Sequence, residues 1–130
     1  MKNFRYVRWM LLLGLLFSAF AFAAPLTEQQ KIDALIHSIE VLPNAQFIRN
    51  GTAYDGKAAA DHLRMKRNYA GSHIKTADDF IACCATGSSM SGKPYQIHYA
   101  NGITINSADY FHAELKRIEA QQTPAPTPKI

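Results

Sequence analysis

Histidine and serine side chains are the residues of this sequence whose types could do chemistry together. His62 lies in a predicted helix, and the segment 87–93, GSSMSGK, holds three serines. A serine hydroxyl becomes a nucleophile when an imidazole accepts its proton and an acid, here Asp61 or Asp55, orients that imidazole. No G-x-S-x-G turn surrounds these serines. A hydrolase-like enzyme that uses a serine of the 88–91 loop with His62 is therefore an alternative and not the leading prediction.

The same segment has the spacing of a phosphate-binding loop as far as Lys93. Pro94 stands where such a loop needs the Ser or Thr whose hydroxyl binds magnesium. A predicted helix precedes the segment and a predicted strand follows it, which is the reverse of the required order. We therefore exclude a nucleoside triphosphate site. The hydroxyls and backbone N–H groups could still form a concave set of donors that holds an anion.

Cys83 and Cys84 are adjacent and are the two cysteines of the chain. Neighbours in a helix point about 100° apart, so they cannot readily bond each other there. Three alternatives stay open: a buried free Cys84 behind Phe80, a strained vicinal disulfide, or pairing of Cys83 with another molecule. There is no C-x-x-C motif, so the pair does not indicate a redox enzyme.

The histidines do not form a metal-ligating pattern. No two of them have the i, i+4 spacing that places two imidazoles on one helix face, and no carboxylate or cysteine cluster stands at ligand spacing. They are His37, His62, His73, His98 and His112. We expect no metal and no cofactor.

Residues 1–23 are typical of a secretory signal peptide. Lys2, Arg5 and Arg8 precede an apolar run over 10–17, and the stretch ends in an Ala-x-Ala cleavage signal. The apolar run is shorter than the roughly 20 residues that a membrane span needs. We predict a periplasmic or secreted protein with no stable membrane anchor after cleavage.

The charge of the chain also depends on this segment. Three of the 14 Lys and Arg lie in the signal peptide, whereas all 10 Asp and Glu follow it, so the mature chain is close to neutral. Only residues 64–67, RMKR, are locally basic. A nucleic-acid-binding domain would keep a dense basic patch, so we expect no nucleic acid partner.

Residues 24–120 predict a small single α+β domain, in which about four helices pack on a short antiparallel sheet that contains a β-hairpin. A capping box at Thr27 opens the first helix, and Asp55 caps a second helix that Gly71 ends. That helix has two weak apolar stripes: Ala59 with Leu63, and Ala58, His62, Met65 and Tyr69. Residues 121–130 are Pro-rich and are predicted to be a disordered tail.

The strands are short. Residues 46–49 predict a strand that the turn pair Asn50-Gly51 closes. Residues 95–105 alternate in polarity around Asn101-Gly102, which predicts a hairpin with a two-residue type I′ turn. A third helix begins at Thr76, and a final helix follows the hairpin from Asn106 or Ser107. The hairpin must pack its apolar face on the helices, because a lone hairpin is marginal.

Four blocks of the sequence are similar to a known family. They are residues 47–51, 59–66, 76–81 and 88–95. The chain resembles a family of small exported bacterial proteins of unknown function, which includes the YfeK-like proteins. The resemblance implies an exported single domain. It implies no activity, cofactor or catalytic residue.

The polar residues of these blocks are the candidate site, because core packing alone does not need them. They are Arg49, Asn50, His62, Lys66, Ser89, Ser91 and Tyr95. We predict that they converge on one surface, where the cations and hydroxyls suit an anionic group on a small ligand or peptide. The alternative is an internal network in which Arg49 and His62 tie the loop to the helix.

The leading function is therefore a binding or interaction module, whose partner is a small anionic ligand, a peptide or an envelope protein. The alternatives are the hydrolase-like enzyme and a purely structural envelope protein. Whether the chain is an enzyme stays open, and no catalytic residue is assigned.

Overall fold

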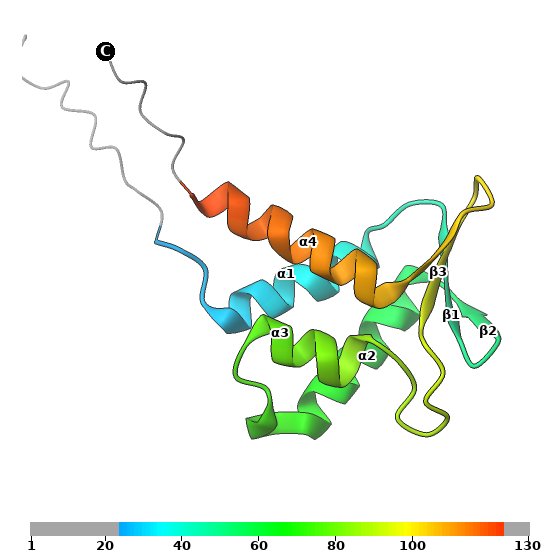
Figure 1. The fold of residues 1–130 in the computed structure, drawn as a ribbon, viewed down its shortest axis with the longest axis horizontal. Coiled ribbons are helices and arrows are strands. Elements are labelled where there is room, and N and C mark those ends of the chain that lie inside the picture. The colour runs from blue at the N-terminus through cyan, green and yellow to red at the C-terminus, as the bar shows by residue number, and fades with distance from the viewer. Residues whose placement is uncertain (1–23, 124–130) are drawn as a thin grey trace, which may run out of the picture.

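The computed structural model describes residues 24–123. The predicted signal peptide, 1–23, and the last seven residues of the predicted tail, 124–130, lie outside the described residues. The described part is a small α+β domain of four α-helices and a four-stranded antiparallel sheet, which confirms the predicted fold class (Figure 1). The elements are α1 (Glu28–Glu40), β1 (Ala45–Arg49), β2 (Thr52–Tyr54), α2 (Gly56–Ala70), α3 (Ala77–Phe80), β3 (Gln96–Tyr99), β4 (Thr104–Asn106) and α4 (Ser107–Gln122).

The helix starts follow the predicted caps. Thr27 and Gln30 form the capping box of α1, and the Asp55 side chain accepts from the backbone N–H of Ala58 at the start of α2. α2 ends at Gly71, whose φ of 52° few other residues adopt without strain. α2 begins close against the end of α1: a Cβ on Gly56 would lie 2.7 Å from the carbonyl oxygen of Ile39. Glycine is therefore needed at this approach.

The sheet has the order β2-β1-β3-β4. β2 was not predicted from the sequence, and it pairs with β1 in a hairpin that places Arg49 opposite Thr52. The two residues between them, Asn50 and Gly51, have φ values of 50° and 77°. Positive φ at both positions is the mark of a type I′ turn.

The type I′ turn predicted at Asn101-Gly102 is wrong. Only Gly102 has a positive φ, 88°. Tyr99 donates its backbone N–H to the carbonyl of Ile103, so three residues and not two connect the strands. This is the geometry of a type I turn followed by a bulge residue. Ile103, which was expected on the apolar face, is 55% exposed beside the hairpin tip.

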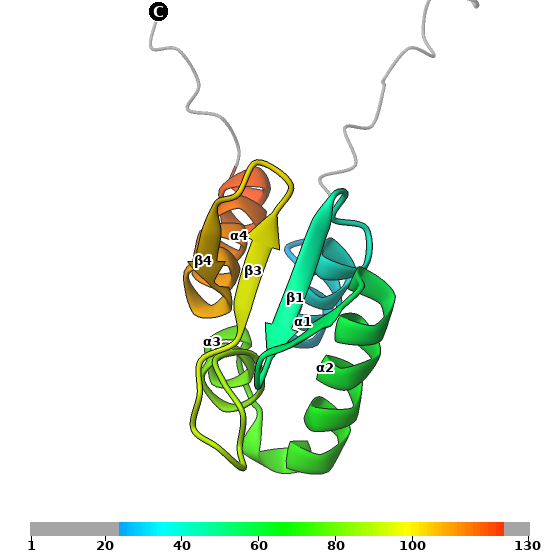
Figure 2. The same cartoon turned by 90° about the vertical axis from the view of Figure 1, so that its right-hand side faces the viewer.

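The helices cover one face of the sheet and leave the other face open. Figure 2 looks onto the open face, with α1 and α4 behind the strands and α2 at the side. Phe47 of β1 and Ile97 of β3 are buried beneath the helices. α1 contributes one apolar face to this core, formed by Ile32, Leu35, Ile36 and Ile39. The rings of Phe80 and Phe111 meet edge to face with centroids 6.3 Å apart.

The second stripe predicted for α2 is not apolar packing. Ala60 and Leu63 are the buried residues of this helix, whereas Met65 is 58% exposed and Tyr69 95% exposed. α2 lies at the flank of the domain, so only one side of it is covered (Figure 2).

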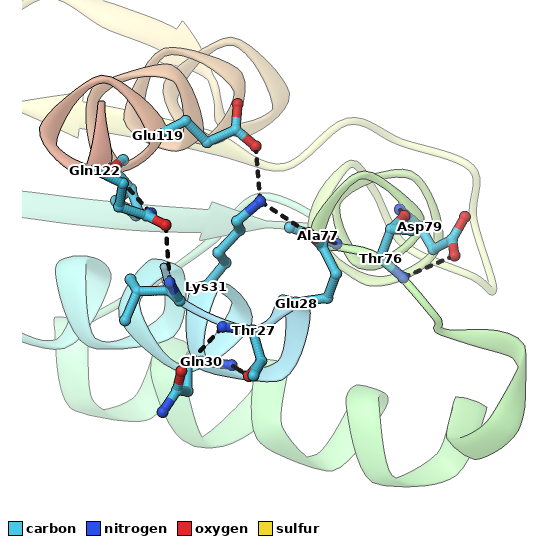
Figure 3. A network of polar contacts seen from close by, with 11 residues as sticks. Thr27, Glu28, Gln30, Lys31, Thr76, Ala77, Asp79, Glu119 and Gln122 are labelled. Carbon is cyan, nitrogen blue, oxygen red and sulfur yellow. Dashed lines mark hydrogen bonds and ion pairs between the residues drawn. The ribbon is translucent and has the colours of Figure 1, made fainter. Parts of the chain in front are cut away.

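The ends of the described chain are joined at the side away from the sheet (Figure 3). Gln122 accepts from the backbone N–H of Leu26 at 2.8 Å, and Lys31 binds both Glu28 and Glu119. Glu28 also accepts from the N–H of Ala77 at the start of α3. α4 runs two residues beyond the predicted domain end at 120, to Gln122, whose side chain is bound by Leu26 ahead of α1. No helix between residues 24 and 123 is long and apolar enough to cross a membrane.

Candidate functional site

Arg49 and His62 meet between β1 and α2. Nη1 of Arg49 lies 2.9 Å from Nδ1 of His62 and 3.1 Å from Nε2. Arginine can only donate, so the nearer ring nitrogen must accept, and we assign the imidazole proton to Nε2. Nη2 of Arg49 donates to the hydroxyl of Tyr54 at 3.3 Å, and the guanidinium carbon lies 5.2 Å from the centre of the Tyr54 ring.

Tyr95 joins this pair to Lys66. Its hydroxyl lies 3.2 Å from Nε2 of His62 and 3.2 Å from Nζ of Lys66. Both neighbours act as donors, so the Tyr95 oxygen accepts twice and its own proton remains available to another acceptor. Lys66 also donates to the carbonyl of Gly87 at 2.9 Å and lies 5.0 Å from the Tyr95 ring centre. We name Arg49, His62, Lys66 and Tyr95 the basic cluster.

Asn50 joins the first turn to the Ser-rich loop. Its Nδ2 donates to Oγ of Ser88 at 3.3 Å, and its Oδ1 accepts from Oγ of Ser91 at 2.5 Å. The N–H groups of Met90 and Ser91 both donate to Oγ of Ser88. We name Asn50, Ser88 and Ser91 the loop clasp. Its groups satisfy one another, so they hold the loop and do not point at a ligand.

Six of the seven predicted site residues thus form two adjoining networks, and Ser89 does not. Ser89 is exposed, and its side chain makes no hydrogen bond within the described part of the chain. The anion-holding loop considered from the sequence is also not supported, because Ser88 and Ser91 already accept from the N–H groups of Met90, Ser91 and Lys93.

An apolar pocket of about 200 Å³ lies beside the basic cluster. Arg49, Tyr54, His62 and Tyr95 line it and keep part of their surface exposed. Lys66 does not line the pocket but lies behind Tyr95. The other lining side chains are mostly apolar and include Ile39, Phe47, Leu63, Ala85 and Phe111.

Among the described residues, the two cations of the cluster have no acidic counter-ion. All ten Asp and Glu of the sequence lie within residues 24–123, and none of them is within 4 Å of Arg49 or Lys66. Arg64, which lies on α2 as Lys66 does, differs from them because it has two acidic partners, Glu40 and Asp61. The pocket therefore lies in a locally positive field.

This field acts on His62. Burial lowers the pKa of His62, and the charges of Arg49 and Lys66 lower it further. The imidazole is accordingly neutral at pH 7, as its contact with Arg49 requires. The positive charge of the cluster resides on the guanidinium and the ammonium.

The geometry of a serine hydrolase is not formed. No serine hydroxyl among the described residues lies within hydrogen-bonding distance of His62, and Ser91 donates to Asn50 instead. Asp61 binds Lys57 and Arg64, and Asp55 caps α2. Neither acid orients the imidazole.

The two cysteines are free thiols, Cys83 exposed and Cys84 fully buried. Cys84 lies in the core, as in the first of the three alternatives, and the two cysteines do not form a vicinal disulfide. They lie in a single π-helical turn, Ile81–Ala85, that follows α3. Burial is the main cause that raises the pKa of Cys84 to about 12, and a hydrogen bond with Cys83 is the second cause. Within the described range, no group of three His, Cys, Asp or Glu is placed to hold a metal ion.

Tyr54 and Ser88 belong to these networks but are not among the seven site residues predicted from the sequence. Tyr54 follows the turn by three residues and lies opposite Phe47, but a strand of three residues gives no clear alternation. Ser88 was detectable, because a serine side chain in a turn often accepts from backbone N–H groups two or three residues on, here those of Met90 and Ser91. The apolar lining residues carry no signal of a site in the sequence, because side chains of this kind usually lie in the core.

Two comparisons with known proteins agree with this description. Residues 26–119 match the family of unknown function DUF5329. The chain is also similar to the uncharacterized protein YfeK of Salmonella typhimurium, with 37% identity over 68 residues. That match covers 52% of this chain and 57% of YfeK, so the chain spans just over half the length of this relative. No solved structure matches the chain.

The family match covers α1 to β4, α4 as far as residue 119, and every residue of the basic cluster and the loop clasp. It also confirms the resemblance inferred from the four sequence blocks. The chain belongs to the family of unknown function DUF5329.

Proposed function

We propose that this domain is an exported binding module for a small organic anion that carries one apolar group. The observation that supports this most is the position of Arg49. Its guanidinium is half-buried at an apolar pocket, where it donates to a neutral imidazole and a phenol and reaches no carboxylate. A partly desolvated cation without a counter-ion favours an incoming carboxylate or phosphate.

The basic cluster offers more than one donor to such an anion. Arg49 keeps N–H groups beyond those used on His62 and Tyr54, because a guanidinium carries five. The hydroxyl proton of Tyr95 is also available, since its oxygen accepts from Lys66 and His62. Lys66 adds charge from behind Tyr95. A carboxylate could therefore accept from two side chains at once.

The pocket defines the apolar part of the ligand. A cavity of about 150 Å³ lined by Leu, Ile and Phe holds a benzene molecule. The pocket here measures about 200 Å³, so it accommodates one phenyl ring or one branched aliphatic group. A long acyl chain would not fit.

The other functions considered have less support. The hydrolase-like reaction requires a serine on His62, and the Ser91 hydroxyl is instead bound to Asn50. A purely structural envelope protein would have no need of a pocket beside two unpaired cations. Export itself is supported by the sequence of residues 1–23.

Titration calorimetry with phenylacetate and isovalerate tests the proposal, with phenylacetamide as the neutral counterpart of the first. We expect at least one of the two acids to bind. If phenylacetate binds, phenylacetamide should bind at least about tenfold more weakly than phenylacetate. Arg49→Gln should weaken binding of the acid by about ten- to a hundredfold, because a hydrogen bond to a charged group is lost.

Arg64→Gln is the matched control, because it removes a cation from α2 that is already paired with Glu40 and Asp61. It should leave the affinity unchanged. Failure of both acids to bind, or an equal loss in the two arginine variants, would overturn the proposal.

A further inference from the structure

The exposed face of α2 leads away from the pocket. Tyr69 follows His62 by seven residues, which is two helical turns, so both side chains share one face of α2. Tyr69 is 95% exposed and Met65, one turn closer to the pocket, is 58% exposed. The residues of the predicted second stripe therefore do share one face of α2, but Met65 and Tyr69 on that face are exposed to solvent.

These two side chains are unusual for a solvated helix face. Tyrosine is enriched where proteins bind one another, because it combines a large rigid ring with a polar end. A methionine adapts its shape to varied partners. Met90, 98% exposed, lies in the Ser-rich loop, whose Gly87 is bound to Lys66 of the same helix. Exposed apolar side chains are thus present on α2, beyond the pocket, and on the Ser-rich loop.

We infer that the anion is the free C-terminal carboxylate of a peptide. This inference rests on the function proposed above. The last residue would place its carboxylate at Arg49 and its apolar side chain in the pocket. The preceding residues would lie along α2 over Met65 and Tyr69. The two turns from His62 to Tyr69 measure about 10 Å, which about three extended peptide residues cover.

A peptide C-terminus fits these features better than an internal acidic residue. A terminal residue carries its carboxylate and its apolar side chain on one Cα, so it can satisfy Arg49 and the pocket together. An internal Asp or Glu has no apolar group to fill about 200 Å³. The charges are complementary as well, because Arg49 and Lys66 lack acidic partners and Lys66 lies between His62 and Tyr69 along the helix.

Fluorescence anisotropy with a labelled hexapeptide that ends in phenylalanine tests the inference. The same peptide with a C-terminal amide is the control. We expect the acid peptide to bind and the amide to bind at least about tenfold more weakly. Tyr69→Ala should weaken the acid peptide about tenfold and leave phenylacetate unchanged, whereas Tyr69→Phe should keep most of the peptide affinity.

The outcomes separate the two proposals. If phenylacetate binds but the hexapeptide does not, or if Tyr69→Ala has no effect on the hexapeptide, the peptide inference is wrong and the small-anion site remains. If the hexapeptide binds equally well as its amide or with Arg49→Gln, the peptide inference is wrong. Both proposals are wrong if, in addition, neither phenylacetate nor isovalerate depends on Arg49 for binding. Tyr69→Ala is expected to fold, because this side chain is almost fully exposed.

Discussion

Nη1 of Arg49 lies 2.9 Å from Nδ1 of His62, so a permanent cation on β1 faces an imidazole on α2. The pair holds only while the imidazole is neutral, because two facing cations repel each other. Protonation of His62 should therefore oppose folding, and the stability of the domain should depend on pH.

The sign follows from the lowered pKa of His62 in the folded state. As the pH falls below about 6.5, the unfolded chain binds a proton at His62 before the folded chain does. The free energy of unfolding should then decrease, and this decrease should stop below the pKa of the folded state. Urea denaturation of the wild type and of His62→Gln between about pH 7.5 and pH 5 measures it. Parallel curves for the two proteins would show that His62 does not contribute.

Asn50 should matter for the Ser-rich loop and not for the backbone turn. Asn50→Gly keeps a residue that tolerates the φ of 50° but removes the bonds to Ser88 and Ser91. We expect a loss of about 1 kcal/mol in stability and faster amide hydrogen exchange of Met90 and Ser91, because the loop clasp is released. Ser89→Ala is the control and should change neither quantity. Unchanged exchange in Asn50→Gly would mean that the loop holds its own shape.

The two thiols should react very differently. Cys83 is exposed, whereas Cys84 is fully buried and its pKa is raised to about 12, so it does not form the reactive thiolate at neutral pH. Iodoacetamide at pH 8 should add one label to the folded protein at Cys83 and two after unfolding in guanidinium. Mass spectrometry of the intact protein and its peptides counts and places the labels. Two rapid labels on the folded protein would contradict this burial.

Phe80 should be among the most costly side chains to remove. It is fully buried and meets Phe111 edge to face, so Phe80→Ala should cost about 3–5 kcal/mol. Tyr69→Ala removes an aromatic ring that is 95% exposed and should change stability by less than about 0.5 kcal/mol. Urea denaturation compares the two variants. A similar cost at both positions would be inconsistent with the described core.

Local signals in the sequence predicted the helices well and the turns less well. The hydroxyl of Thr27 and the carboxylate of Asp55 specify helix starts through contacts within a few residues. The two Asn-Gly pairs look alike in the sequence but adopt different turns. The pairing of the strands decides between them: Arg49 lies opposite Thr52, whereas Ile97 lies opposite Ile105. A register of this kind depends on what each strand buries and is not visible in two residues.

The candidate site was predictable in its polar part and not in its pocket. Arg49, His62, Lys66 and Tyr95 could be selected because polar residues in such blocks are not needed for a core. The pocket combines residues from α1, β1, α2 and α4, such as Ile39, Phe47, Leu63 and Phe111. Each of these residues is typical of an ordinary core, and only the packing of these and further elements leaves a space between them.

The hairpin of β1 and β2 continues directly into α2, with Asp55 as the one residue between strand and helix. Arg49 and His62 are therefore 13 residues apart in the chain, whereas His62 and Tyr95 are 33 apart. Contacts between residues close in sequence need little loop closure and can form early in folding. The cationic side of the pocket can thus assemble before residues 87–95 arrive to complete it. Folding intermediates of this protein should then already carry the positive charge proposed to recognise an anion, but not Tyr95 or Phe111, which complete the lining of the pocket.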